Sequence, residues 1–251
     1  MKWYFALAIA AMSLWNLSCF ADVPPLQILR EAAENGNSEA QSALAEAYAE
    51  GKGVKQNYEE AVKWYQMAAT QGNVKAEFNL GLMYSTGEGV AHDDAEAVKW
   101  WRKAAEHGDP RSQANLGAMY ATGRGAPQNY DEALKWDRAA AVHGEASAEY
   151  NLGRMYDIGE GVEKNDIESI KWLRMAAEQG HAKAQGYLGL QYMTGHGVPR
   201  DFVIADMWLQ LADAGGDEGA HVARFVAEIQ MDSDQKIEAQ KLVQAWKPKM
   251  E

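Results

Sequence analysis

The sequence predicts an all-α solenoid, and three observations lead to this fold class. Six glycines from Gly36 to Gly216 lie 36 residues apart, without an insertion or a deletion between them. One tyrosine and one tryptophan recur in step with these glycines in each of five units. Each unit also contains two helical patterns that are separated by a glycine-rich turn. Such a period is typical of repeat proteins, in which every unit packs on its neighbours.

The first segment has the pattern of a signal peptide. Lys2 precedes an apolar run over residues 3–17, and small residues end the segment at Ala21. The run is about 15 residues long, whereas a membrane span needs roughly 20. We therefore expect residues 1–21 to be removed and the remaining chain to be periplasmic or secreted, without a transmembrane segment. The alternative is a lipoprotein that is lipid-modified at Cys19.

The charge of the chain argues against a nucleic-acid partner. The whole chain has a formal net charge of −12, and residues 22–251 keep 23 basic against 36 acidic residues, which gives −13. Binding to phosphates requires a basic face.

Cys19 is the only cysteine, so disulfides cannot stabilise the chain after cleavage, even in an oxidising compartment. The stacking of the units must stabilise it.

The first helix of each unit, helix A, ends at a pair of glycines. In the second unit it is expected over residues 74–86, with Ala76 and Leu80 on its apolar face. Gly87 should end this helix because glycine readily adopts the left-handed conformation, and Gly89 keeps the turn tight. The same pair of glycines recurs in the other four units.

The second helix of each unit, helix B, is expected to begin after an N-cap residue. A short polar side chain at this position accepts a hydrogen bond from an amide of the first turn. A glutamate three residues later, present in four units, predicts a capping box. The N-caps are Asn57, Asp93, Asn129, Asn165 and Asp201, and the glutamates are Glu60, Glu96, Glu132 and Glu168.

Glycine also occurs in the middle of helix A, where it costs about 1 kcal/mol relative to alanine. Paired alanines in helix B, such as Ala104 and Ala105, suggest that the two helices approach closely enough to offset this cost. We interpret the repeating tyrosines and tryptophans as core residues that fill the wider parts. The mid-helix glycines are Gly81, Gly117, Gly153 and Gly189.

The unit resembles the Sel1-like repeat family, a relative of tetratricopeptide repeats. The resemblance rests on A-x-x-x-L-G-x-x-Y-x-x-G-x-G-V, followed by A-V-K-W and A-A-x-x-G, and covers five full units over residues 36–215. It implies an α/α superhelix that acts as an adaptor for protein complexes. Residues 22–35 should then form an N-terminal half-repeat cap, and residues 216–251 a degenerate half-repeat with a C-terminal capping helix. Arg224-Phe225 stands there in place of leucine-glycine.

The sequence contains no catalytic motif, so we expect no enzyme activity, no cofactor and no dedicated metal centre. A cysteine-rich branch of the family, some of whose members are associated with β-lactam binding, carries a cysteine pair in each repeat. These pairs are missing here, and a β-lactam-binding or cell-wall-active enzyme remains the alternative function. His107 is interpreted as a solvated residue in the last turn of a helix B. A metal site built across units would need carboxylate partners that the sequence does not place.

The resemblance to tetratricopeptide repeats implies which helix A residues point into a concave groove that binds a protein or peptide. Three asparagines in step would form a ladder for a peptide backbone, and three aromatic residues would anchor the partner. Four cations favour an acidic segment or a C-terminal carboxylate. Alternatively, the asparagines only satisfy neighbouring helix ends. The predicted residues are Lys75, Phe78, Asn79, Leu82, Arg111, Asn115, Tyr150, Asn151, Arg154, Lys183, Tyr187 and Leu190.

Overall fold

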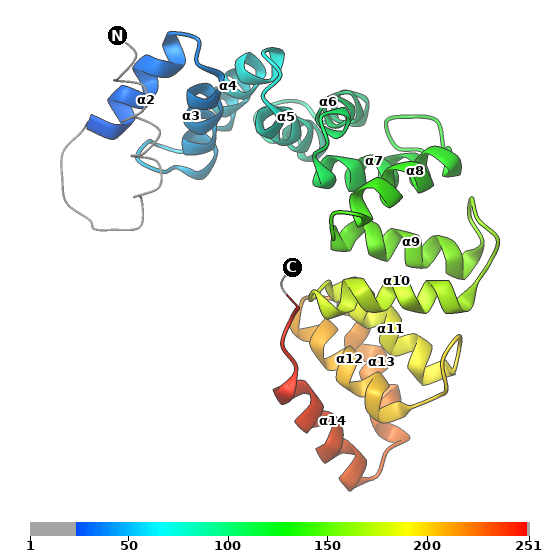
Figure 1. Cartoon of the computed structure of the whole chain (residues 1–251). Coiled ribbons are helices and arrows are strands. Elements are labelled where there is room, and N and C mark those ends of the chain that lie inside the picture. The colour runs from blue at the N-terminus through cyan, green and yellow to red at the C-terminus, as the bar shows by residue number, and fades with distance from the viewer. Residues whose placement is uncertain (1–23, 250–251) are drawn as a thin grey trace.

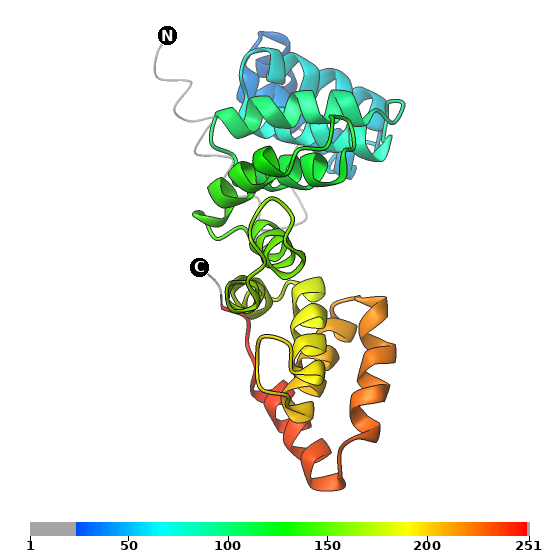
Figure 2. The ribbon, with the colours of Figure 1, turned by 90° about the vertical axis from the view of Figure 1, so that its right-hand side faces the viewer.

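The computed structural model describes residues 24–249, so the predicted signal peptide over residues 1–21 lies outside the described part. Within that part the chain folds into thirteen α-helices without a strand. Successive helices pack on one another and build a curved solenoid, which runs from α2 to α14 as an arc in Figure 1 and twists in Figure 2. The helices are α2 (Pro24–Glu34), α3 (Ser38–Glu50), α4 (Tyr58–Thr70), α5 (Val74–Thr86), α6 (Asp94–Glu106), α7 (Pro110–Thr122), α8 (Tyr130–Ala141), α9 (Ala146–Ile158), α10 (Asp166–Glu178), α11 (Ala182–Thr194), α12 (Phe202–Ala214), α13 (Glu218–Ile229) and α14 (Ser233–Ala245).

The predicted helix ends are confirmed. Helix A of the second unit is α5, and Gly87 closes it with φ 77° while its amide donates to the carbonyl of Met83. Asn57 caps α4, since its side chain accepts from the amide of Glu60. The other four predicted N-caps of helix B act in the same way. No helix in residues 24–249 is long and apolar enough to cross a membrane.

The predicted capping boxes at Glu60, Glu96, Glu132 and Glu168 are wrong in one of their two hydrogen bonds. The N-cap side chain accepts from the first turn, but the glutamate does not accept from the N-cap amide. The carboxylate of Glu60 accepts from Lys63 Nζ instead of the N-cap amide. That amide, the N–H of Asn57, already donates to the carbonyl of Tyr48 in the preceding helix A at 2.9 Å. The other three glutamates likewise bind a lysine three residues later. Each glutamate carboxylate therefore pairs with a lysine, because the N-cap amide already donates to a carbonyl of the preceding helix A.

The mid-helix glycines face helix B of their own unit, as predicted, but not at the paired alanines. A Cβ atom on Gly81 would lie 2.6 Å from the Trp101 ring, and one on Gly153 would lie 2.7 Å from Leu173 Cγ. Ala105 instead belongs to a core cluster with Leu116 of the following unit. Glycine thus allows close packing within a unit, and small residues of helix B serve the contact between units.

The last helix does not continue the repeat pattern. Phe225 of α13 occupies the position of the mid-helix glycine, so a following helix cannot approach α13 as closely as a helix B normally does. Helix α14 packs on α12 instead, and Trp246 meets Trp208 edge to face at 6.5 Å. Figure 1 shows α14 beside α12 at the C-terminal end of the solenoid. Phe225 is consequently 64% exposed.

Candidate functional site

The predicted groove residues lie on α5, α7, α9 and α11, and contacts join several of them from one unit to the next. Lys75 Nζ is 2.7 Å from Glu46 Oε2 of the preceding helix A. The Arg111 guanidinium lies 4.0 Å from the centre of the Phe78 ring. Tyr150 and the next unit's Tyr187 meet edge to face. Consecutive helices A therefore touch along this set of residues, which we name the helix A row.

Half of the twelve predicted residues are exposed, and the others are half-buried. The exposed ones include two leucines, Leu82 and Leu190, with exposed fractions of 40% and 39%. The row therefore presents charged and apolar side chains together to solvent. The exposed residues are Lys75, Leu82, Arg111, Arg154, Lys183 and Leu190, and the half-buried ones are Phe78, Asn79, Asn115, Tyr150, Asn151 and Tyr187.

The three asparagines make different contacts, so they do not form a regular series of equivalent donors along the row. Asn79 Nδ2 donates to the carbonyl of Lys75 in its own helix at 2.9 Å. Asn151 Nδ2 donates to Oδ1 of the buried Asp137 at 3.0 Å. These two amide donors are used inside the fold, which favours the structural interpretation of Asn79 and Asn151. Asn115 makes no side-chain hydrogen bond within residues 24–249.

Unpaired positive charge is concentrated in units four and five. Lys75 is neutralised by Glu46, and Arg111 by Asp109 at 3.0 Å. Arg154 and Lys183, by contrast, form no ion pair with any described residue. Attraction for an acidic partner is therefore expected around α9 and α11 rather than along the whole row.

Aromatic side chains accompany these free cations. The rings of Tyr150 and His181 are 5.0 Å apart. Burial raises the pKa of the Tyr150 hydroxyl, and the Arg154 charge opposes this shift. Burial, together with a hydrogen bond to Asp157 and the charge of that carboxylate, raises the pKa of Tyr187 to about 12. Both tyrosines thus stay neutral near pH 7, and the Tyr187 hydroxyl donates its hydrogen to Asp157 Oδ2.

We name the group formed by Tyr150, Arg154, Lys183, Tyr187 and Leu190 the unit 4/5 patch. It joins two aromatic rings, two unpaired cations and one exposed aliphatic side chain on neighbouring helices A. This combination offers positive charge and apolar surface side by side.

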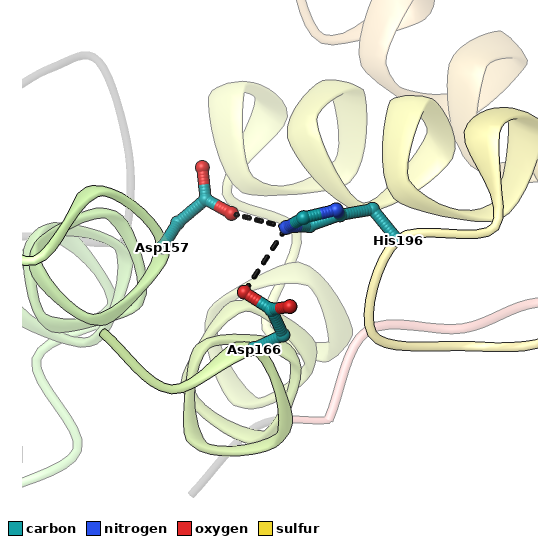
Figure 3. Close-up of side chains that lie close together, drawn as sticks. All are labelled: Asp157, Asp166 and His196. Carbon is teal, nitrogen blue, oxygen red and sulfur yellow. Dashed lines mark hydrogen bonds and ion pairs between the residues drawn. The ribbon is translucent and has the colours of Figure 1, made fainter.

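A second group of side chains lies beside this patch, and sequence reasoning missed it. Figure 3 shows Asp157, Asp166 and His196 pointing toward one another. Asp157 Oδ2 accepts from the Tyr187 hydroxyl at 2.9 Å, so the group is linked to the unit 4/5 patch. A signal was present in the sequence, since Ala121 and Glu160 hold the positions of Asp157 and His196 in the preceding unit.

Sequence reasoning also missed a contact of His107, whose side chain is 49% exposed, and a repeating arginine. His107 is not merely solvated, because its Nδ1 lies 3.0 Å from the carboxylate of Glu77, which is 2% exposed. In four places an arginine of helix B donates to the tyrosine hydroxyl of the next helix A, 18 residues later. These pairs are Arg30 with Tyr48, Arg102 with Tyr120, Arg138 with Tyr156 and Arg174 with Tyr192. Their fixed spacing could have revealed them as inter-unit contacts.

Comparison with known proteins agrees with this architecture. The Sel1 repeat profile matches residues 38–73, 74–109, 110–141, 146–181 and 182–217. No protein with curated annotation matches the chain.

Three solved structures share the fold. The chain is similar to c5321, described as a protective antigen present in uropathogenic Escherichia coli strains displaying an SLR fold, with 34% identity and a TM-score of 0.86 over 96% of this chain and 52% of that one. It thus spans about half the length of that relative. A Sel1 repeat protein from Oxalobacter formigenes is 30% identical, with a TM-score of 0.75 over 91% of this chain and 98% of that one. A putative sel1 repeat protein from Klebsiella pneumoniae subsp. pneumoniae is 20% identical with a TM-score of 0.52, over 81% and 99% of the two chains, and supports the fold alone.

Proposed function

Because the chain belongs to the Sel1 repeat family, we propose that it is an exported protein-binding scaffold that holds an acidic segment of its partner at the unit 4/5 patch. The observation that carries this proposal is the pair of unpaired cations, Arg154 and Lys183, beside Tyr150 and Tyr187. On a chain with a net charge of −12, a local positive patch directs an acidic ligand to one place.

The neighbouring rings supply the second part of the recognition. Tyr150 and Tyr187 are half-buried and held against each other, so little side-chain entropy is lost when a partner packs on them. Aromatic residues and arginine are the side chains that most often dominate binding energy at protein interfaces.

Export is supported by the pattern of residues 1–21, and mass spectrometry of the native N-terminus tests it. A chain starting at Asp22 is expected, whereas a lipid-modified Cys19 would contradict this cleavage.

The binding site is tested with an array of acidic peptides, prepared with free and with amidated C-termini. Neutral peptides with Asn and Gln in place of Asp and Glu serve as the reference. Fluorescence anisotropy then gives the Kd of the best acidic peptide for each variant. We expect Arg154→Glu combined with Lys183→Glu to weaken binding about tenfold or more.

The matched control is Lys236→Glu combined with Lys241→Glu, which makes the same charge change on the exposed surface of α14. It should leave the Kd within about twofold, because α14 packs on α12 rather than on the helices of the patch and solvent screens these exposed charges. Equal weakening in both double variants would show that net charge alone is measured, and the patch would then be rejected. Turnover of nitrocefin by the wild-type protein would instead favour the enzymatic alternative.

A further inference from the structure

Two carboxylates and one imidazole converge where unit four meets unit five, as Figure 3 shows. Asp157 lies in the last turn of α9, Asp166 is the first residue of α10, and His196 is in the turn between α11 and α12. His196 Nε2 is 3.5 Å from Asp157 Oδ1 and 3.0 Å from Asp166 Oδ1. One ligand atom from each residue lies within 4.8 Å of the other two. We propose that these three side chains bind a Zn²⁺ ion that ties the two units together.

The separations of the two carboxylates from the imidazole nitrogen suit a single tetrahedral ion. Zinc binds nitrogen and oxygen ligands at about 2.0–2.2 Å, which places two ligands of one tetrahedron about 3.3–3.6 Å apart. The distances of 3.0 and 3.5 Å from His196 Nε2 to the two carboxylates lie close to this value. A water molecule completes the four ligands. The imidazole favours zinc over Ca²⁺ and Mg²⁺, which prefer oxygen ligands throughout.

The most buried ligand is already held in position. The Asp157 side chain is 13% exposed. Its Oδ2 accepts from the Tyr187 hydroxyl at 2.9 Å, and its Oδ1 accepts from Gln191 Nε2 at 3.2 Å. Hydrogen bonds of this kind orient ligating carboxylates in metal sites. Asp166 and His196 are 35% and 42% exposed, so an ion can enter from solvent.

The fold does not require this set of residues. At the junction of units two and three the equivalent positions hold Ser85, Asp94 and Arg124, and Arg124 forms a two-pronged ion pair with Asp94 at 2.9 and 3.1 Å. At that junction Asp94 contacts both Arg124 and His92, and Ser85 stands where Asp157 supplies the second carboxylate. Of the junctions in this chain, the one between units four and five combines an imidazole with two carboxylates.

Lys164 lies against the cluster. Its Nζ is 3.4 Å from His196 Nε2 and 3.5 Å from Asp166 Oδ1, and its side chain is 52% exposed. A lysine on a long flexible stem can move into water when an ion of higher charge takes its place. Lys164 therefore competes with the metal, and its removal should tighten metal binding.

The test uses the full-length chain without an affinity tag and with Cys19→Ser, so that neither a tag nor a thiol binds metal. Zinc is titrated against a chromophoric chelator, and Co²⁺ absorption reports tetrahedral coordination. We expect one Zn²⁺ per chain, a higher Tm with Zn²⁺ present, and tighter binding by Lys164→Gln. His196→Arg should weaken binding at least about tenfold and remove the Tm shift.

His196→Arg introduces the residue that pairs with Asp94 at the equivalent position, Arg124. Asp157→Ala introduces the residue found at the equivalent position Ala121. Both variants therefore carry residues that other units of this chain have at the same positions. Circular dichroism confirms that they fold. His143→Ala, which removes an exposed histidine far from the cluster, is the control and should bind zinc like the wild type. The proposal is overturned if zinc shows no saturable site, or if His196→Arg and Asp157→Ala bind as tightly as the wild type.

Discussion

The carboxylate of Asp137 in α8 lies directly against the Cα atom of Gly117 in α7. The same position of helix B holds Leu173 and Leu209 in the next two units, each facing its own mid-helix glycine. Asp137 is fully buried, and its Oδ2 makes no hydrogen bond within residues 24–249. Unit three therefore places a carboxyl group in a contact that the neighbouring units fill with an apolar side chain.

Gly117→Ala should destabilise the protein by about 1–3 kcal/mol, although alanine is the better helix former. The new methyl group would overlap the Asp137 side chain, and α7 and α8 would have to separate. Thermal and urea unfolding measure the change. Gly219→Ala in α13 is the matched control, because the nearest atom to its Cβ is at 3.4 Å. It should be neutral or stabilising by up to about 1 kcal/mol, and an equal loss in both variants would contradict the packing role.

Asp137→Leu should raise the free energy of unfolding at pH 7 by about 1–3 kcal/mol. The substitution removes a buried polar group and restores the side chain found at Leu173 and Leu209. Asn151 loses its partner at the same time, but it is half-buried and can turn toward water. Urea unfolding measures the gain. A variant less stable than the wild type would show that the hydrogen bond from Asn151 outweighs the cost of burial.

The stability contributed by Asp137 should fall as pH rises. Burial raises the pKa of this carboxyl well above its usual value, and the hydrogen bond from Asn151 opposes the shift. Above about pH 4, the unfolded chain gives up this proton while the folded chain retains it, so the folded state binds more protons. The difference in stability between Asp137→Leu and the wild type should therefore be smallest near pH 4 and grow toward neutral pH. A difference that does not change with pH would refute this assignment.

His181 should make the start of α11 sensitive to acid. Its Nδ1 accepts from the amide of Ala184 at 3.1 Å, which a protonated imidazole cannot do. Burial and the charge of Lys183 lower the pKa of His181. As pH falls below about 6.5, the unfolded chain takes up this proton before the folded chain does, so stability is lost.

His181→Asn tests this effect, because an asparagine oxygen caps α3 and α5 and does not titrate in this range. Urea unfolding at pH 7.5 and 5.5 should show a larger loss on acidification in the wild type than in the variant. Equal losses would mean that His181 is not the titrating group.

Trp246→Ala should loosen α14 from the rest of the solenoid. The ring packs on Trp208 and lies near Gly180, and the following Lys249 amide donates to the carbonyl of Glu178. We expect a loss of about 1–3 kcal/mol, below the value for a fully buried tryptophan, and faster hydrogen exchange in α14. Ile237→Ala, at a position 53% exposed on the same helix, is the control and should change little. Unchanged exchange in α14 would show that other contacts hold this helix.

Much of the local structure follows from the sequence because its causes lie within a few residues. Gly87 ends α5, since a left-handed residue is needed there, and Asn57 caps α4 with its own side chain. The same N-caps and turn glycines recur every 36 residues, so the α/α solenoid and its helix bounds could be predicted. The recurrence of the helix A row from unit to unit could also be predicted, because the period keeps its residues in step.

Tertiary structure alone decided which side chains meet across units and which remain free. The row contains four cations. Glu46 of the preceding helix A neutralises Lys75, whereas Arg154 and Lys183 form no ion pair within residues 24–249. Asn151 turns toward Asp137, and His196 meets Asp157 across 39 residues, because helix packing sets these distances. The sequence by itself determined the repeating framework, since local backbone preferences repeat with it. The three-dimensional stacking determined the chemistry of the unit 4/5 junction, since charge and hydrogen bonding depend on neighbours that are distant along the chain.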